Sequence, residues 1–146
     1  MKRTASALVL LPAAFLLAAC TAASSTEPAL SSFASVDEAY DAVAATLDCD
    51  PATTAEPVTV EIDGYLPQYR MCTETVEIIR YDNEADRMEA TELIEGAENG
   101  PGYFAEGNNW HVLVLPGRDG TVPGSNEVSE LADAMGGRFV TNGGTE

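Results

Sequence analysis

The fold is decided by the stretch Val76-Glu77-Ile78-Ile79-Arg80-Tyr81-Asp82-Asn83-Glu84. Its first six residues are rich in β-branched and aromatic side chains, which predicts a strand. Asp82-Asn83 then predicts a helix start, because the acidic residues Glu84 and Asp86 complement the positive end of the helix dipole. The helix is expected to run to about Glu95 and to be ended by Gly96. Its expected apolar face consists of Ala90, Leu93, Ile94 and Ala97.

The residues after this helix predict a hairpin, a third helix and a last strand. Strands are expected at Tyr103–Ala105 and Trp110–Leu115, joined by the turn Glu106-Gly107-Asn108-Asn109. Apolar residues at helical spacing then predict a helix around Val128 to Met135, and a short strand follows at Arg138–Thr141. From about residue 75 the order is β-α-β-β-α-β, that of the ferredoxin-like split βαβ fold. We expect residues 110–115 beside residues 76–81, with both helices on one face of an antiparallel sheet.

The residues before this unit predict an N-terminal helix and an extended segment. Ser35 and Glu38 form a capping box at the start of a helix expected over Val36–Leu47. A short strand is expected at Val58–Ile62, and Tyr65–Thr73 is extended but interrupted by a proline. We therefore expect a single small α+β domain over residues 35–141, followed by a disordered tail at 142–146.

The first twenty residues have the features of a secretion signal. Lys2 and Arg3 precede an apolar run from Ala5 to Ala19, which is shorter than the roughly 20 residues of a membrane-spanning helix. The sequence Leu17-Ala18-Ala19-Cys20 resembles the bacterial lipobox. The resemblance implies a diacylglyceryl group on Cys20 and cleavage before it, and two acyl chains anchor a protein stably. The alternative is an ordinary signal peptide that contains a cysteine.

This interpretation defines the expected organisation and location of the chain. Residues 1–19 are the lipoprotein signal peptide, and residues 20–34 are the lipidated cysteine and a flexible tether biased to Ser, Thr and Ala. The protein is then extracytoplasmic and held on the bacterial cell membrane by lipid. Its partners would be the membrane, reached through Cys20, and an envelope protein.

The charge of the chain excludes some partners. Without residues 1–19, five arginines face 24 acidic residues, a net charge of −19. Such a surface repels nucleic acid and anionic lipid head groups. A solvated acidic surface that keeps an exported protein soluble explains this charge more simply than binding to a polycation.

With Cys20 assigned to lipid, Cys49 and Cys72 remain, and an oxidising compartment favours their disulfide. In the chain-entropy model this bond stabilises the domain by roughly 3 to 3.5 kcal/mol. A metal or redox site would need a CxxC motif or nearby histidines, which the sequence does not contain.

His111 is the one histidine of the chain, and Trp110 is the one tryptophan. Along their strand, His111 alternates with leucines and Trp110 with valines, so both faces of the strand are expected to be covered. We interpret His111 as a buried side chain satisfied by a neighbour, and we keep Trp110 and His111 as candidate ligand-binding residues. The acidic clusters lack the EF-hand pattern. We identify no catalytic set, metal site or cofactor motif.

The lipobox, the pair Cys49 and Cys72, the segment Ile79–Arg87 and the hairpin Tyr103–Val114 together resemble small lipoproteins of high-GC Gram-positive bacteria. The resemblance implies a location and no particular activity. The leading hypothesis is a non-enzymatic interaction or envelope-associated module. The alternative is a lipoprotein that binds a ligand or cation through its acidic surface or the sheet face near Trp110. An enzyme centred on His111 is a third hypothesis.

Overall fold

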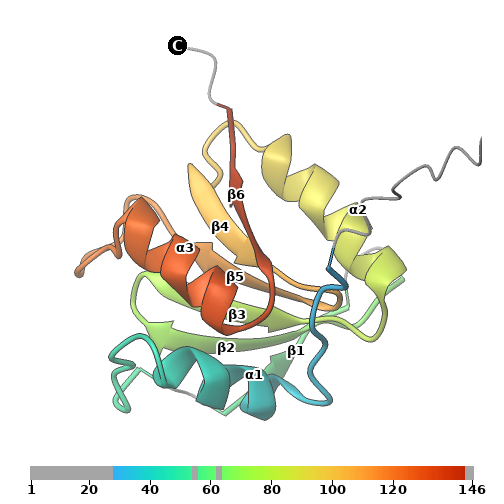
Figure 1. Ribbon diagram of the computed structural model, residues 1–146, viewed down its shortest axis with the longest axis horizontal. Coiled ribbons are helices and arrows are strands. Elements are labelled where there is room, and N and C mark those ends of the chain that lie inside the picture. Colours follow the sequence, from blue (N-terminus) through green and yellow to red (C-terminus); the bar gives the residue numbers. More distant parts are fainter. Residues whose placement is uncertain (1–27, 54–55, 62–63, 144–146) are drawn as a thin grey trace, which may run out of the picture.

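The computed structural model describes residues 28–53, 56–61 and 64–143, which form one antiparallel sheet with helices on both faces (Figure 1). Cys20 and the predicted signal peptide lie outside these residues, as do residues 144–146 of the predicted tail. Within the described part of the chain, no helix is long and apolar enough to span a bilayer. The elements are α1 (Val36–Ala44), β1 (Val58–Thr59), β2 (Gln68–Thr73), β3 (Val76–Arg80), α2 (Glu84–Glu95), β4 (Tyr103–Glu106), β5 (Trp110–Val114), α3 (Ser125–Ala134) and β6 (Arg138–Thr141).

The sheet has the strand order β1-β2-β3-β5-β4-β6, and every neighbouring pair is antiparallel. The predicted α+β class and the β-α-β-β-α-β order from β3 onward are confirmed. Strand β5 lies between β3 and β4, which is the split βαβ arrangement, and it pairs with β3 as expected. The register places Ile79, His111 and Glu106 side by side across these three strands.

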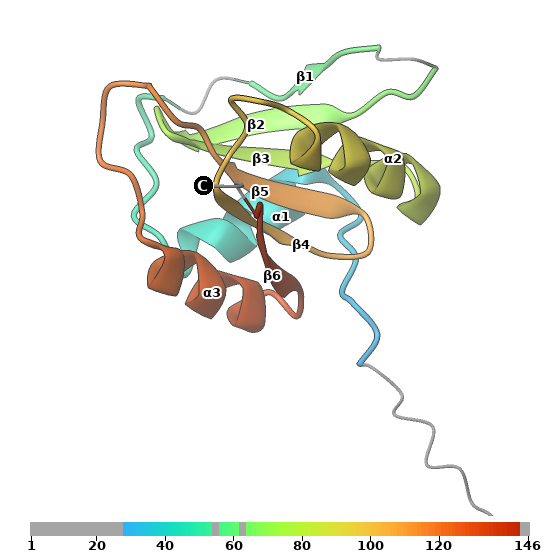
Figure 2. The same ribbon diagram turned by 90° about the horizontal axis from the view of Figure 1, so that it is seen from above.

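The two crossover helices lie on opposite faces of the sheet, so the expectation that they share one face is wrong. Helices α1 and α3 lie together on one face and α2 lies on the other (Figure 2). Strand β2 pairs with the side of β3 that β5 leaves free, so β6 pairs with β4 at the far edge of the sheet. Both crossovers therefore step two positions in the same direction across the sheet. Because β3 and β5 are antiparallel, two crossovers of the same hand must place their helices on opposite faces.

Local signals define the helix ends largely as the sequence predicts. The Ser35 hydroxyl accepts a hydrogen bond from the Glu38 backbone amide (3.1 Å), and the Glu38 carboxylate accepts from the Ala34 amide (2.8 Å). The Asn83 side chain caps α2 in the same way by accepting from the Asp86 amide (3.0 Å). Helix α1 ends at Ala44, three residues earlier than expected, whereas α2 ends at Glu95 as predicted.

The face covered by α1 and α3 is an apolar core centred on Trp110. The Trp110 side chain is fully buried, and its indole lies against Gly107 and Gly137. A Cβ atom at Gly107 would come within 2.0 Å of the indole Nε1, so the ring needs a glycine at this position. On the same face the predicted disulfide is present and joins Cys49 to Cys72, which lies on β2, with 4.5 Å between their Cα atoms.

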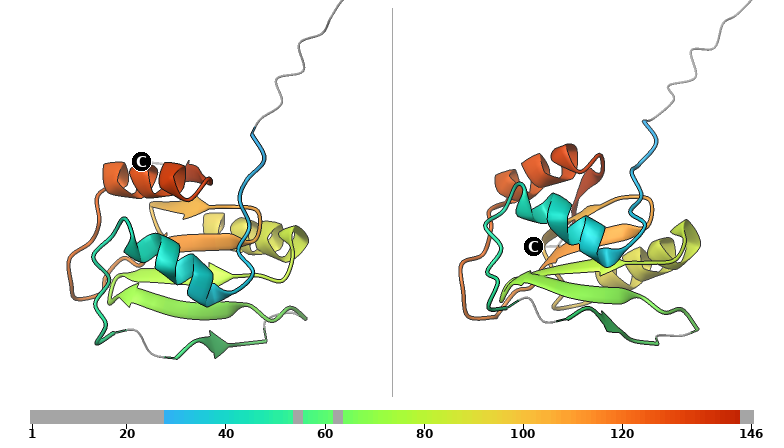
Figure 3. Two further views of the ribbon diagram at one scale, coloured as in Figure 1. Left: turned by 60° about the horizontal axis from the view of Figure 1, so that its bottom comes forward. Right: turned by 90° about the horizontal axis from the view of Figure 1, so that it is seen from below.

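The chain segment before α1 is bound to this core. The Ser31 amide donates to the Gly136 carbonyl (2.9 Å), and the Ser31 carbonyl accepts from the Asn108 amide (2.8 Å) and from the Trp110 indole (3.2 Å). The Phe33 ring packs on Trp110 with 5.8 Å between centroids. The folded domain therefore begins by Ser31, before the predicted boundary at residue 35, and residues 31–34 of the expected tether belong to it (Figure 3).

Candidate functional site

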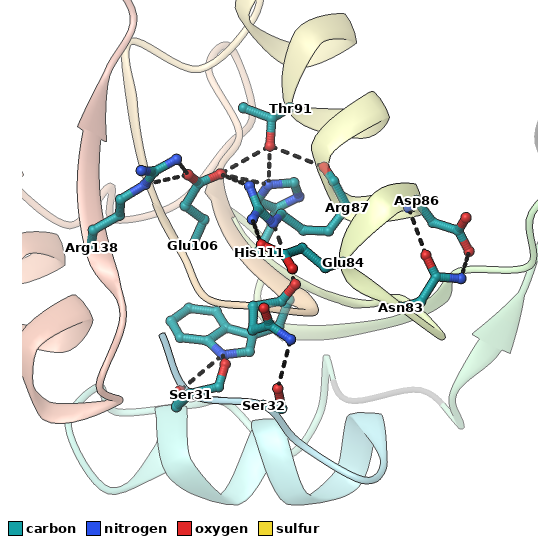
Figure 4. Close-up of polar contacts among 12 residues, drawn as sticks. Ser31, Ser32, Asn83, Glu84, Asp86, Arg87, Thr91, Glu106, His111 and Arg138 are labelled. Carbon is teal, nitrogen blue, oxygen red and sulfur yellow. Dashed lines mark hydrogen bonds and ion pairs between the residues drawn. The ribbon is translucent and has the colours of Figure 1, made fainter. Parts of the chain in front are cut away.

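The main concentration of polar chemistry in the described chain lies beneath α2, on the face opposite Trp110 (Figure 4). We name it the Glu106 cluster. Its members are Tyr81, Arg87, Thr91, Glu106, His111 and Arg138. Five of the six are at most 9 % exposed, and the side chain of Arg138 is half exposed at the rim. The cluster thus joins α2 to three strands of the sheet.

Glu106 is the centre of the cluster and has no exposed surface. Its Oε2 accepts from the Thr91 hydroxyl (2.9 Å) and lies 3.4 Å from a guanidinium nitrogen of Arg87. Its Oε1 accepts from the Arg138 Nε (2.6 Å) and forms a second, close contact with the same guanidinium. The carboxylate is therefore bonded through both oxygens, as a buried charge requires.

His111 links Glu106 to Tyr81. The His111 Nε2 lies 3.2 Å from the Glu106 Oε2 and 2.9 Å from the Thr91 hydroxyl, while Nδ1 lies 2.9 Å from the Tyr81 hydroxyl. Since a carboxylate can only accept, we assign the ring proton to Nε2. The Tyr81 hydroxyl then donates to Nδ1, and both ring nitrogens are satisfied.

Burial determines the protonation states of this chain of groups. Burial lowers the pKa of His111 and outweighs the opposing effect of Glu106, so the imidazole is neutral at neutral pH. Burial also raises the pKa of Tyr81 far above its usual range. For Glu106, burial alone would raise the pKa, but hydrogen bonds from His111, Arg138 and Thr91 lower it to about 2. At neutral pH, Tyr81 and His111 are therefore neutral and Glu106 is a charged carboxylate.

Glu106, His111 and Tyr81 form a hydrogen-bonded chain of a carboxylate, an imidazole and a hydroxyl. Such a chain can transfer a proton, as in nucleophilic triads. Here, however, the terminal hydroxyl belongs to Tyr81, which is 2 % exposed, and it donates into the cluster. This hydroxyl is therefore enclosed within the protein. What the arrangement does is bond α2 to β5 and β4, so His111 is a buried histidine satisfied by its neighbours.

The two candidate ligand-binding residues do not form one site. Trp110 and His111 are neighbours on β5, but their side chains lie on opposite faces of the sheet, as the alternation predicts. Both are 0 % exposed. Among the described residues, no group of three or more His, Cys, Asp or Glu side chains is placed to hold a metal ion.

Sequence reasoning missed most of the cluster. The sequence predicts Glu106 in the hairpin turn, whereas in the structure it ends β4 and pairs with His111. On α2, the buried face carries Arg87 and Thr91 beside Ala90, and the expected core residue Leu93 is 55 % exposed. One sequence pattern could have indicated the cluster. Arg87 and Thr91 are four residues apart and so share one face of the predicted helix, and the next predicted strand is followed by the acidic residue Glu106.

Comparisons with known proteins add no relative. No protein-family model matches the chain, and neither a curated protein nor a solved structure matches it.

Proposed function

We propose that the protein is an extracytoplasmic lipoprotein, anchored to the bacterial cell membrane through Cys20, whose folded domain is a non-enzymatic interaction or envelope-associated module. The observation that carries the proposal is the Cys49–Cys72 disulfide. Disulfides persist in oxidising compartments and are rare in the cytosol. This bond uses both cysteines of the domain and leaves Cys20, in its lipobox-like context, for lipid.

The Glu106 cluster supports the non-enzymatic part of the proposal. The chain has one histidine, and its two ring nitrogens are occupied by Tyr81, Thr91 and Glu106 inside a closed core. Catalytic acids and bases need contact with a substrate. The groups best suited to chemistry are instead used for packing α2 against the sheet, which leaves surface recognition as the simpler role.

The anchor is tested by metabolic labelling with an alkyne fatty acid in a bacterial host that processes lipoproteins. We expect the wild type to incorporate label and to fractionate with membranes, and Cys20→Ser to lose both properties. The matched control is the double variant Cys49→Ser/Cys72→Ser, which should keep its label because those thiols lie in the folded domain. Labelling that survives Cys20→Ser would overturn the proposed anchor.

The interaction role is tested by crosslinking in living cells followed by isolation of the full-length protein from the envelope. The expected result is a partner that is recovered reproducibly with the lipidated protein and reduced with Cys20→Ser. Recovery of no common partner across growth conditions contradicts the role.

A second candidate function, ligand or cation binding, is favoured by one specific observation. A cleft of about 530 Å³ lies between the end of α1, the β2–β3 turn and the loop before α3, and its lining includes Asp48, Asp50, Glu74 and Glu127. This volume is in the range of small-molecule sites. Titration with calcium, copper and small cationic solutes, followed by tryptophan fluorescence and calorimetry, tests it. Flat titrations remove this candidate.

A further inference from the structure

A second hollow of the surface lies at the β1 edge of the sheet, and we name it the β1 groove. Its volume is about 340 Å³. It is lined by Glu56, Val58, Val60, Tyr69, Arg70, Met71 and Glu77. Strand β1 forms the edge of the sheet furthest from α3 (Figure 3), and among the described strands it has a neighbour, β2, on one side only. The groove therefore combines a concave surface with a free strand edge.

The floor and wall of the groove are apolar and exposed. Val58 pairs with Tyr69, so the two side chains share a face, and alternation places Val60 on that face as well. Val58 is 53 % exposed and Val60 is 43 % exposed. An open strand edge can pair with another strand, and here Pro57 and the two-residue length of β1 restrict that pairing to a short stretch. The exposed valines beside Tyr69 give the groove an apolar wall that is open to a partner.

The charge around the apolar surface selects the kind of partner. Among the residues that the structure describes, Glu56 and Glu77 are the acidic groups that line the groove. Burial raises the pKa of Glu77, and the charge of Arg118 acts in the opposite direction, so a cation beside this carboxylate favours its charged form. Arg70, the basic residue of the lining, is already paired with Asp37. A second copy of this chain, with a net charge of −19 in the mature form, would be repelled.

We propose that the β1 groove binds an extended segment of a partner protein in which apolar side chains alternate with lysine or arginine. The apolar side chains would pack on Val58, Val60 and Tyr69, the basic ones would pair with Glu56 and Glu77, and the backbone would extend the sheet at β1. This inference rests on the proposed role as an interaction module. It adds the surface and the chemistry of the partner.

The test uses the full-length lipidated protein in nanodiscs of neutral phosphatidylcholine and a fluorescent eight-residue peptide of alternating lysine and valine. Anisotropy should show saturable binding at physiological salt, and a peptide of alternating glutamate and valine should not bind. Val58→Ser/Val60→Ser should weaken binding about tenfold, because it removes roughly 1.4 kcal/mol of apolar contact. Glu77→Gln should weaken it roughly two- to fivefold, as expected for a partly exposed ion pair.

The matched controls are on α2, none of whose residues lines the groove. Met88→Ser/Leu93→Ser removes an apolar pair of similar exposure, 53 % and 55 %, and Glu92→Gln removes an exposed acid. Neither control should change the affinity. Equal losses in the groove and control variants would mean general attraction to an acidic surface and would overturn the proposal, as would equal binding of both peptides.

Two further outcomes separate this inference from the proposed function. A dimer that is seen by sedimentation and lost in Val58→Ser/Val60→Ser would assign the groove to a second copy of the chain and overturn the inference. An envelope partner that crosslinks as strongly to Val58→Ser/Val60→Ser as to the wild type would leave the proposed function in place and place the interface elsewhere. Loss of the partner both in Val58→Ser/Val60→Ser and in Cys20→Ser would support the proposed function and this inference together.

Discussion

The two faces of the sheet are stabilised by different physics. The face beneath α1 and α3 is apolar, with Trp110 fully buried between glycines and packed on Phe33. The face beneath α2 contains a buried carboxylate, a buried histidine and a buried guanidinium held together by hydrogen bonds. Apolar packing does not depend on pH, whereas a network with a buried charge does. One face of this domain is therefore stabilised independently of pH, and the other face depends on the protonation of its buried groups.

The difference follows from what each helix offers the sheet. Helix α3 buries Val128, Leu131 and Ala132, and these need no partner beyond contact. Helix α2 buries Arg87 and Thr91 beside Ala90, so its docking requires bonds with acceptors on the strands. Glu106 and His111 are paired across β4 and β5, so these hydrogen bonds fix where α2 lies along the sheet.

The largest expected effect comes from breaking the apolar face. Trp110→Ala leaves a cavity and releases the Ser31 segment, and we expect the free energy of unfolding to fall by about 4 kcal/mol. Urea unfolding followed by far-UV circular dichroism measures it. The loss should be nearly the same at pH 7.5 and pH 5.5, and a strongly pH-dependent loss would contradict the contrast between the faces.

The next largest effect comes from the charge on the other face. Glu106→Gln keeps the shape but leaves the Arg87 guanidinium without its buried counterion, which should cost about 3 kcal/mol. The pKa of Glu106 agrees in sign and size, since a fall from 4.5 to about 2 corresponds to roughly 3 kcal/mol of stability at neutral pH. The matched control is Glu92→Gln on the exposed side of α2, where a change near zero is expected.

The pH dependence of unfolding sharpens the comparison. Burial lowers the pKa of His111 below 6.5 in the folded protein, so the unfolded chain binds more protons and stability falls as the pH drops from 6.5. Glu106 adds to this loss below pH 4.5, because its pKa is depressed in the folded state. In His111→Gln the slope between pH 6.5 and about pH 5 should be reduced. An unchanged slope would show that His111 is not the group that titrates.

The smallest expected effect is at the end of the polar chain. Tyr81→Phe keeps the ring contact with His111 and removes only the hydroxyl that donates to Nδ1, so a loss of about 1 kcal/mol is expected. Chemical denaturation at pH 7 measures the loss. The imidazole ¹⁵N shifts provide a second check, because Nδ1 loses its donor while Nε2 keeps its proton. A loss as large as that of Glu106→Gln would mean that Tyr81 also supports packing of the α2 face.

Sequence patterns predicted the elements better than the site. The caps at Ser35 and Asn83 and the alternation along β5 are local, and the structure contains all of them. The disulfide followed from counting cysteines. Glu106 was missed because an acid next to Gly107 in an Asn-rich segment is typical of a turn, and only its pairing with His111 reveals a strand. The apolar character of Leu93 predicts a buried position, but α2 buries Arg87 and Thr91 and leaves Leu93 exposed.

The sequence by itself determined the order of helices and strands, the starting caps of α1 and α2, the pair of cysteines that bond and the acidic character of the chain. These depend on local backbone preference, side-chain period and residue count. Only the tertiary structure decided which face each helix covers, because that depends on β2 pairing with β3, which leaves β6 to pair with β4 at the far edge of the sheet. The same register brought a glutamate, a histidine and two arginines together over long separations in the chain. Long-range pairing of strands sets these contacts, and no local pattern encodes it.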